Sequence, residues 1–380
     1  MAAAGVSPLR FPAVARPEVS VVMVAYGGLA WTGRALQALL DHTGPVFELI
    51  VVDNPAGDGT AELLAREAEG ATLLLNRTNV GFSAACNQGA AHARGRHLAF
   101  LNNDLFVHAG WLPPLLGALE SEGVGAAGPR FLNLDGSLQE AGALLSRSGV
   151  PLDYGSGDEP GRPAYRFPRT VDYLAGACLL VRRSAFCAVG GFDAVFGLGY
   201  YEDADLCLRL AAAGYRTVYE PRSVVTHVRG GSGAAGSLQT LVLRNQSLFE
   251  ERWRPLLASR PLPPLAGNPR RMLAARDAPA EARFLVLSPE NPGPGSPASV
   301  LIDRLRSEHP RAQITLAAVG EAGGGPEAER LLGLGVEVEV RAEGWSPWLL
   351  ARRFHYDAVY GSVPALDGLV CRTQPQAFWW

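Results

Sequence analysis

The chain has 380 residues, of which 48% are hydrophobic and 19% are charged, and its formal net charge is −3. These values suit a soluble globular protein of two or three domains and exclude a strongly basic surface for nucleic acid. No run approaches the roughly 18 apolar residues that cross a bilayer, and the N-terminus lacks the basic and apolar regions of a signal peptide.

Residues 1–17 are expected to form a flexible lead-in, after which apolar runs and helical periodicity alternate. This alternation predicts βαβ units around a parallel sheet with right-handed crossovers. The predicted strands of this part are 19–26, 47–54, 72–75, 98–101 and 125–128, and the predicted helices are 31–40, 60–69, 83–93 and 111–121.

Polar residues follow two of these strands. Asp53 lies at the end of one strand, and Asn102, Asn103 and Asp104 follow another. Ligands of open α/β sheets bind outside the carboxyl ends of the strands, so Asp53 is placed to accept a ring N–H of a pyrimidine. Asp104 is placed to hold a divalent cation against a diphosphate. A turn or capping role is the alternative for either Asp, but two such endings in successive units favour the functional interpretation.

Residues 131–170 are rich in Gly, Pro, Asp and Arg and are expected to be an irregular insert. An apolar pattern resumes over 171–183, and a helix is predicted from Glu202 to the residue before Gly214. Acidic residues in a first helical turn complement the helix dipole. Asp203 also has a second interpretation, because a transferase needs a carboxylate to deprotonate an acceptor hydroxyl.

His227 ends a short apolar run. Taken alone, it is more simply a core or surface histidine. Near Asp104 it would be a nitrogen ligand, which suits Mn²⁺ and is tolerated by Mg²⁺. The glycine-rich residues 230–233 that follow are either a loop that closes over a diphosphate or a plain linker.

The C-terminal third has a different composition followed by a fresh α/β pattern. Residues 255–282 are rich in Pro and Arg and are expected to be a linker, with residues 283–380 forming a second, incomplete Rossmann-like α/β domain. Its predicted strands are 284–287, 313–319, 336–340 and 358–360, and its predicted helices are 298–307, 327–334 and 348–354.

A series of motifs resembles the family 2 inverting glycosyltransferases, and within them the bacterial rhamnosyltransferase-like branch. The motifs follow one another in the family's order, which makes the resemblance far more specific than any single motif. They are the strand 19–26, 51–54, Asn79-Val80-Gly81-Phe82 with Asn87 and Gly89, 101–104, Gly176-Ala177-Cys178 with Arg182-Arg183, 191–193, 201–206, and His227 before 230–232.

The resemblance implies a GT-A fold, with a Rossmann-like mixed sheet, over residues 18–254. It implies that Asp203, supported by Glu202, is the catalytic base, and that Asp104 and His227 bind Mn²⁺ or Mg²⁺. Gly176 and Ala177 would border the acceptor. The donor would be bound by Tyr26, Asp53, Asn79, Gly81, Phe82, Asn87, Asn102 and Asn103. The triplet 102–104 carries a single acid, which makes the dependence on a metal less strict than two acids would.

The resemblance also implies an activity and partners. The expected reaction is inverting transfer of a sugar, rhamnose on this branch, from a dTDP or UDP donor to a hydroxyl of a bacterial surface glycan or a lipid-linked acceptor. Residues 283–380 resemble the N-terminal half of a GT-B glycosyltransferase. The five scattered cysteines form no CxxC pair, so a cytoplasmic protein is expected, with peripheral attachment to the inner face of the membrane left open.

Two other functions stay open. A degenerate glycosyltransferase could serve as a nucleotide-sugar-binding or scaffold module, because the triplet has one acid and the second domain is partial. A nucleotidyltransferase would share the fold, but residues 26–30, after the first strand, form no Gly-rich basic loop for a triphosphate.

Overall fold

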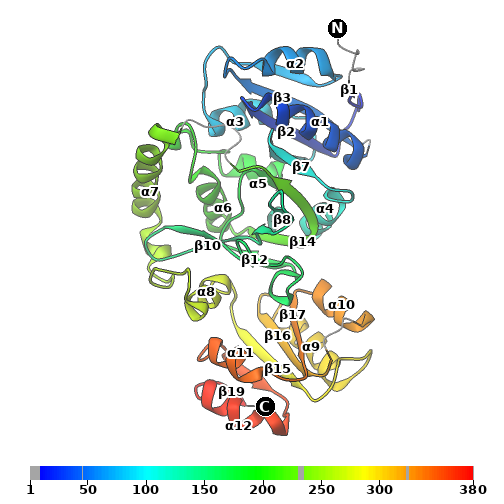
Figure 1. Cartoon of the computed structure of the whole chain (residues 1–380), viewed down its shortest axis with the longest axis vertical. Helices are drawn as coiled ribbons and strands as arrows, with labels where there is room; N and C mark the ends of the chain where they lie inside the picture. Colours follow the sequence, from blue (N-terminus) through cyan, green and yellow to red (C-terminus); the bar gives the residue numbers. More distant parts are fainter. Residues whose placement is uncertain (1–8, 45, 230–234, 322–324, 380) are drawn as a thin grey trace. The chain divides into compact units, whose positions relative to one another are not determined.

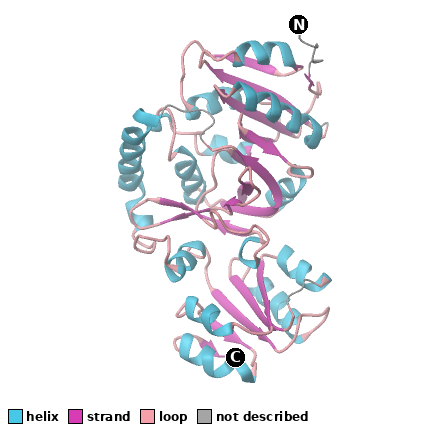
Figure 2. Cartoon of the chain, in the orientation of Figure 1, coloured by secondary structure: helices cyan, strands magenta, loops and turns pink. Residues whose placement is uncertain are grey.

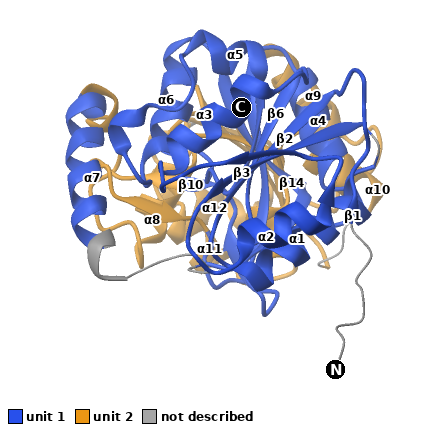
Figure 3. Ribbon diagram, turned by 90° about the horizontal axis from the view of Figure 1, so that it is seen from above, with its two compact units in different colours: residues 1–143, 155–158, 172–254 blue, residues 144–154, 159–171, 255–380 orange. Residues whose placement is uncertain are grey.

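The computed structural model describes residues 9–44, 46–229, 235–321 and 325–379, which form two compact units (Figure 1, Figure 3). Unit 1 comprises residues 1–143, 155–158 and 172–254, and unit 2 comprises residues 144–154, 159–171 and 255–380. Most of the insert expected to be irregular therefore belongs with the C-terminal part of the chain, which the sequence pattern does not indicate.

A mixed sheet forms the centre of unit 1 (Figure 2) and confirms the predicted fold class. The strands of unit 1 are β1 (Leu9–Arg10), β2 (Val19–Tyr26), β3 (Phe47–Asn54), β4 (Ala68–Glu69), β5 (Thr72–Leu75), β6 (His97–Asn102), β7 (Leu105–Val107), β8 (Val124–Leu132), β9 (Leu138–Glu140), β13 (Cys178–Arg182) and β14 (Arg216–His227). The main order is β14-β8-β13-β6-β2-β3-β5. β13 is antiparallel to β6 and β8, so the sheet is not purely parallel.

Helices pack on this sheet and leave its carboxyl-terminal edge to the connecting loops. They are α1 (Leu29–Thr43), α2 (Thr60–Glu67), α3 (Phe82–His92), α4 (Leu112–Glu120), α5 (Arg183–Ala188) and α6 (Glu202–Ala212), with a short 3₁₀ helix η2 (Ala194–Phe196). A further helix, α7 (Ala235–Leu257), contacts α6 and the loop before it. The sequence pattern does not predict α7.

The predicted strands 19–26 and 47–54 agree with β2 and β3, but one predicted helix boundary is wrong. The helix expected over 60–69 ends at Glu67, because Ala68 and Glu69 form β4. β4 pairs in parallel with β1, and Phe11 is buried against Phe47. Residues 9–11 of the expected lead-in are thus packed on unit 1, and its flexibility stays a prediction.

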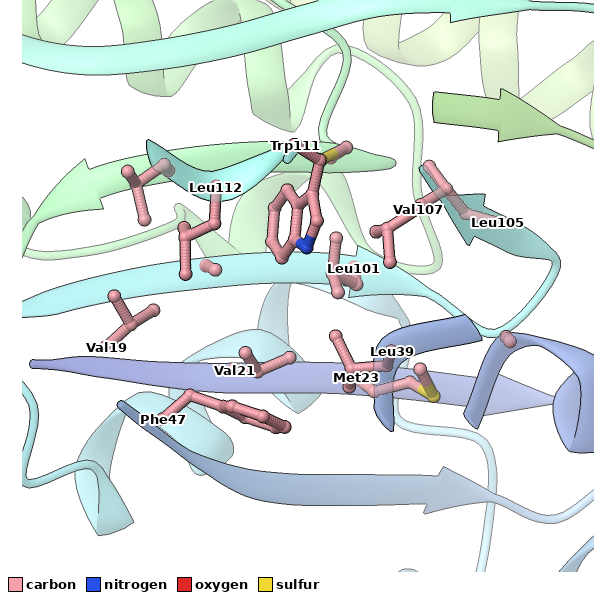
Figure 4. Packing of buried hydrophobic residues seen from close by; sticks show 14 of the residues in the cluster. Val19, Val21, Met23, Leu39, Phe47, Leu101, Leu105, Val107, Trp111 and Leu112 are labelled. Atoms are coloured by element: carbon pink, nitrogen blue, oxygen red, sulfur yellow. The ribbon is translucent and has the colours of Figure 1, made fainter. Parts of the chain in front are cut away.

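The apolar core of unit 1 fills the space between the sheet and helices α1 and α4 (Figure 4). Alternate residues of β2, namely Val19, Val21 and Met23, lie in this cluster. The indole of Trp111 is fully buried there, and its N–H donates to Thr43 Oγ1 over 3.1 Å. The core therefore fixes β2 and β6 while their polar ends stay at the edge of the sheet.

Unit 2 is a second α/β region with a parallel five-stranded sheet in the order β17-β16-β15-β18-β19. Its strands are β10 (Ala143–Leu145, which begins in unit 1), β11 (Pro151–Asp153), β12 (Arg169–Val171), β15 (Arg283–Ser288), β16 (Gln313–Val319), β17 (Val336–Arg341), β18 (Ala358–Tyr360) and β19 (Phe378–Trp379), and its helices are η1 (Pro163–Tyr165), α8 (Pro269–Arg276), α9 (Pro297–Glu308), α10 (Pro326–Gly333), α11 (Trp345–Ala351) and α12 (Pro364–Thr373). Numbered along the chain, this sheet has the order 3-2-1-4-5, which is the doubly wound arrangement.

Buried charges in unit 2 are paired. Arg276 Nη2 lies 3.0 Å from Glu337 Oε2, and its Nε lies 2.6 Å from Asp277 Oδ1. Arg352 Nη2 lies 2.7 Å from Glu337 Oε1, and His355 Nε2 lies 2.8 Å from Asp277 Oδ2. Removing one member would leave an uncompensated buried charge, so the network ties α8 to β17 and to the segment after α11.

Two glycines on different helices test how closely α3 packs on the sheet. Gly89 of α3 lies against Val22, and an added Cβ would collide with the Val22 side chain. Gly117 of α4 has open space around its Cα. We expect Gly89→Ala to lower the free energy of unfolding by about 1–3 kcal/mol. Gly117→Ala should raise it by about 0.5–1 kcal/mol. Urea denaturation of both variants measures the difference, and equal effects would contradict the close packing.

Candidate functional site

Neighbouring strands bring the candidate residues to one edge of the unit 1 sheet. Ala25 of β2 is the register partner of Asp53 in β3, and Val24 is the partner of Asn102 in β6. The N–H of Asn102 donates to Ala177 O over 3.0 Å, just before β13 begins. With about 4.8 Å between strands, β3 and β13 are about 15 Å apart. One extended ligand can therefore contact all four strand ends.

Asp53 has an acceptor atom that the protein leaves unpaired. The residue is 3% exposed, and within the described part of the chain its Oδ1 has no hydrogen-bond partner. Burial raises its pKa, and the charges of Asp58 and Glu62 raise it further. A buried acceptor without a donor is costly, and a ligand N–H would satisfy it. Tyr26, at the end of the neighbouring β2, is 37% exposed, and its register partner in β3 is Asn54.

The turn before α3 is held by two asparagines. Asn79 Oδ1 accepts the N–H of Gly81 over 2.9 Å, and Asn54 Oδ1 accepts the N–H of Val80 over 3.2 Å. Gly81 has φ = +85°, and a Cβ there would collide with the carbonyl oxygen of Gly197. Asn54 was not predicted as a site residue, although its position directly after Asp53 at the end of a strand indicated that it lies near the site.

Asn87 and Asn103 contact the protein's own backbone. Asn87 donates to Phe192 O over 2.8 Å and accepts the Phe192 N–H over 3.0 Å. Asn103 Nδ2 donates to Gly27 O and to Thr32 Oγ1, each over 2.7 Å. Both amide hydrogens of Asn103 are thereby used, which leaves its carbonyl oxygen for a ligand. These two side chains hold the turns beside the site, and their predicted donor contacts stay predictions.

Asp104 and His227, which were predicted to bind one metal ion, lie close together, and the metal role stays a prediction. His227 pairs with Leu105 across β14 and β7, and its Nε2 lies 3.4 Å from Asp104 Oδ1. The N–H of Val228 donates to Asp104 O over 3.0 Å. Asp104 is 4% exposed. The glycine-rich residues 230–233, proposed as a closing loop, lie outside the described residues.

Gln139 of β9 fixes the proton position on His227. Its Nε2 donates to His227 O and to Asn133 Oδ1, each over 3.0 Å, so its Oε1 is the atom 2.8 Å from His227 Nδ1. An amide oxygen only accepts hydrogen bonds, hence His227 Nδ1 carries the proton. In a neutral ring, Nε2 then turns a lone pair toward the Asp104 carboxylate. A cation would satisfy both electron-rich atoms.

The donor set at this place fits a hard or borderline divalent cation bound together with phosphate oxygens. Among residues 9–44, 46–229, 235–321 and 325–379, no three His, Cys, Asp or Glu side chains gather as a metal site. Asp104 and His227 would therefore be the protein ligands, and the ligand's phosphates or water would complete the coordination.

Asp203 lies at the N-terminus of α6 beside the start of β13. Its Oδ2 accepts the N–H of Gly176 over 3.0 Å, and its Oδ1 accepts the N–H of Ala204 over 2.7 Å. Gly176 is confined between two side chains, because an added Cβ would lie 3.1 Å from Phe82 Cε1 and 3.3 Å from Asp203 Cβ. Backbone donors thus stabilise an ionised, partly exposed carboxylate at this point.

Glu202, the preceding residue, is buried and differs from Asp203. It is 6% exposed, and its Oε2 has no hydrogen-bond partner in the described part of the chain. Burial raises its pKa to about 8, with the charge of Asp203 as the second cause. Burial therefore favours the protonated form of Glu202 at neutral pH, whereas the Asp203 carboxylate accepts two backbone hydrogen bonds.

The loop before α6 is clamped by α7. Tyr200 and Tyr201 have φ of 71° and 73°, a conformation that is unfavourable for large side chains. Asn245 is fully buried, and its Nδ2 lies 2.7 Å from Phe196 O, 2.8 Å from Gly199 O and 3.1 Å from Tyr200 O. Asn245 thereby offsets the strain next to Asp203. The sequence carried no signal for it.

Comparison with known proteins bears on this site. The glycosyl transferase family 2 model matches residues 20–189. The N-acetylglucosaminyl-diphospho-decaprenol L-rhamnosyltransferase of Mycobacterium tuberculosis is 30% identical over 252 residues, covering 60% of this chain and 82% of that enzyme. An uncharacterized protein of Sinorhizobium fredii is 30% identical over 233 residues, 58% of this chain. This chain spans about a quarter of that protein, 26%.

A solved structure has the same fold. The crystal structure of GalNAc-T7 with UDP, GalNAc and Mn²⁺ superposes with a TM-score of 0.51 and 18% sequence identity, covering 65% of this chain and 50% of that one. This likeness shows the GT-A architecture of the mixed sheet. In the described part of this chain, no helix is both long and apolar enough to cross a membrane.

The raised pKa of Glu202 predicts a pH-dependent stability. The folded state holds this proton more tightly than the unfolded chain, whose reference pKa is 4.5. The free energy of unfolding should therefore fall from about pH 4.5 to about 8, with a slope approaching ~1.4 kcal/mol per pH unit. Glu202→Gln should remove this contribution, so that the variant becomes more stable relative to the wild type as the pH rises. Urea denaturation across the pH range measures it.

The exposed Glu120 is the control for that measurement. Glu120→Gln should leave the pH profile unchanged. A Glu202→Gln profile parallel to that of the wild type would show that Glu202 ionises normally.

Proposed function

The chain belongs to glycosyl transferase family 2, and on this premise we propose that it transfers a sugar from a nucleoside diphosphate to an acceptor hydroxyl with inversion of the anomeric carbon. The observation that carries the proposal is the common edge of β3, β2, β6 and β13 and the carboxylates near it. Asp53 has an unpaired oxygen, Asp104 lies beside His227, and Asp203 accepts backbone hydrogen bonds. That the protein is a glycosyltransferase follows from the family.

The nucleoside is proposed to bind at the ends of β2 and β3. The unpaired Asp53 Oδ1 is suited to a ring N–H of uracil or thymine, which favours UDP or dTDP. Tyr26 would lie against the base, and the turn 79–82 would border the ribose and phosphates. Asn102 and the carbonyl oxygen of Asn103 would add hydrogen bonds.

The diphosphate is proposed to lie near Asp104 and His227 together with Mn²⁺ or Mg²⁺. When bound, the metal neutralises charge on the departing diphosphate, so that no general acid is needed. Asp104 contributes a carboxylate oxygen, and His227 contributes the unprotonated Nε2 that Gln139 sets. A single protein acid suits this site, since the diphosphate brings its own negative charge.

Asp203 is proposed as the base. The hydrogen bonds from Gly176 and Ala204 fix its carboxylate and stabilise the negative charge, while Glu202 stays neutral. The acceptor hydroxyl would give its proton to Asp203 as its oxygen forms the new bond to the anomeric carbon. The bond from that carbon to the diphosphate breaks on the opposite face, which gives inversion in a single displacement.

The sugar and acceptor are proposed from the relatives. Rhamnose from dTDP or UDP is our choice for the donor sugar, because the mycobacterial relative is named an L-rhamnosyltransferase. A glycan or lipid-linked acceptor of bacterial polysaccharide synthesis fits the same relative. We further propose that the enzyme works in the cytoplasm, at the inner face of the membrane where a lipid-linked acceptor would lie.

The domain roles are also proposals. Residues 18–254 would be the catalytic GT-A domain, residues 255–282 a linker, and residues 283–380 a partial GT-B-like domain. The strand order 3-2-1-4-5 of unit 2 supports the last assignment. A degenerate glycosyltransferase that serves as a scaffold remains the alternative, and the first prediction below separates the two.

Asp203→Asn tests the base. We expect the rate of transfer to fall by about 10²–10⁴-fold, while UDP or dTDP affinity stays within twofold because Asp203 lies away from the nucleoside. Product formation from a panel of nucleotide sugars and isothermal titration with the nucleotides measure both. The exposed Asp41 of α1 gives the control, Asp41→Asn.

Full activity of Asp203→Asn would refute the assigned base. A wild-type protein that binds none of UDP, dTDP and GDP, with or without Mn²⁺, would favour the scaffold alternative.

Gln139→Leu tests the orientation of His227. Loss of the acceptor for Nδ1–H frees the ring to change tautomer, so we expect Mn²⁺ affinity in the presence of UDP to fall by about 10–100-fold. Gln139→Glu keeps an acceptor for Nδ1–H, so its Mn²⁺ affinity should fall less. Isothermal titration with Mn²⁺ measures the affinity without any turnover. The exposed Gln37 of α1 supplies the control Gln37→Leu, and equal affinity of Gln139→Leu and the control would contradict the role of Gln139.

A further inference from the structure

A second cavity in unit 1 lies at the other ends of the strands that form the site. Its volume is ≈ 590 Å³, and its walls are residues 15–17, 94–96, 183, 184 and 187. These residues come just before β2, just before β6 and just after β13. The eight residues of β2 separate the cavity from the candidate site by about 23 Å. The cavity is therefore distinct from the donor and acceptor positions.

The charges of this cavity are all positive. Its walls include Arg16, Arg94, Arg96 and Arg183 and no carboxylate. Arg94 Nη2 is paired with Glu48 Oε2 over 2.6 Å. Within the part of the chain that the structure describes, Arg16, Arg96 and Arg183 have no ion-pair partner. Three arginines thus line one cavity without a paired counter-charge.

Hydrogen bonds hold the loops that form the walls of the cavity. Arg94 also donates to Val14 O over 3.2 Å, which holds the lead-in against the loop before β6. Gly95 lies so close to β2 that an added Cβ would be 2.5 Å from Ser20 N, and its own N–H donates to Ser20 Oγ over 2.8 Å. The loop before β6 is linked to α5, because the Arg183 N–H donates to Arg96 O over 3.2 Å.

The buried His97 supports a positive potential at this end of the sheet. It follows Arg96 directly and pairs with Arg182 across β6 and β13. Burial lowers its pKa to about 4, and the charges of Arg96 and Arg182 lower it further. The ring therefore stays neutral at physiological pH, and the positive charge of the region comes from arginine.

We propose that this cavity, the arginine pocket, binds the phosphate or diphosphate group of an anionic ligand. The planar guanidinium fork matches phosphate oxygens, and the volume accommodates an organic group attached to the phosphate. Such a group can belong to a soluble phosphorylated compound or to a lipid headgroup at a membrane surface. The inference does not rest on the proposed glycosyl transfer.

The test compares the double variant Arg96→Ala/Arg183→Ala with the wild type. All substituted side chains are exposed, so folding should be preserved. The control is Arg34→Ala/Arg66→Ala, which removes the same charge from exposed positions of α1 and α2. Isothermal titration with inorganic pyrophosphate in EDTA measures the soluble arm, since EDTA removes divalent metal from the candidate site. Cosedimentation with phosphatidylglycerol vesicles, against phosphatidylcholine vesicles, measures the lipid arm.

We expect the double variant to bind either pyrophosphate or phosphatidylglycerol vesicles at least tenfold more weakly than the wild type and the control do. Loss in the pyrophosphate arm alone identifies a soluble phosphate ligand, and loss in the vesicle arm identifies a headgroup. The proposal is overturned if the wild type binds neither probe, or if the control loses as much affinity as the double variant, because net charge rather than the pocket would then be responsible.

Discussion

The hydrogen-bond register of β3, β2, β6 and β13 is the constraint on which the site depends. Parallel pairing brings the carboxyl ends of β3, β2 and β6 to one edge, and the antiparallel β13 brings its first residues to the same edge. A slip of one residue would turn every side chain to the other face of the sheet. The Asp53 side chain would then face the other side of the sheet, and Ala177 would no longer accept from Asn102. The apolar core in Figure 4 enforces the register.

Asparagine amides hold the loops that this edge leaves without regular structure. Asn54 and Asn79 shape the turn before α3, Asn87 fastens the turn at Phe192, and Asn245 clamps the loop before α6. An amide both donates and accepts, so one side chain can replace the missing ladder bonds of a loop without adding charge. The loops around the site are therefore held without charged side chains, and the negative charge of the site is limited to its few carboxylates.

The parts that the sequence predicts are those governed by local pattern. β2 and β3 are continuous apolar runs, and the proximity of Asp104 to His227 follows from motif order. α7 was not predicted, although apolar residues such as Leu241, Phe249 and Trp253 recur along it. Its attachment to α6 relies on polar contacts distant in sequence, such as Arg252 with Asp205 at 2.8 Å. Residues 159–171 reach the rest of unit 2 through contacts distant in sequence, such as Gly335, where an added Cβ would lie 2.9 Å from Pro168 O. No local pattern encodes such a contact.

The charges at the edge are distributed so that each carboxylate can hold a different state. Glu202 is buried without a donor and keeps its proton, while two backbone N–H groups stabilise Asp203 as an anion. A second ionised acid at 202 would repel both Asp203 and an incoming diphosphate. At Asp104 the neighbour is His227, whose Nε2 would, under the proposed function, add a ligand atom without adding negative charge. The Asn-Asn-Asp triplet thus leaves room for the negative charge that a diphosphate donor itself would bring, which is why one acid there is sufficient under the proposed function.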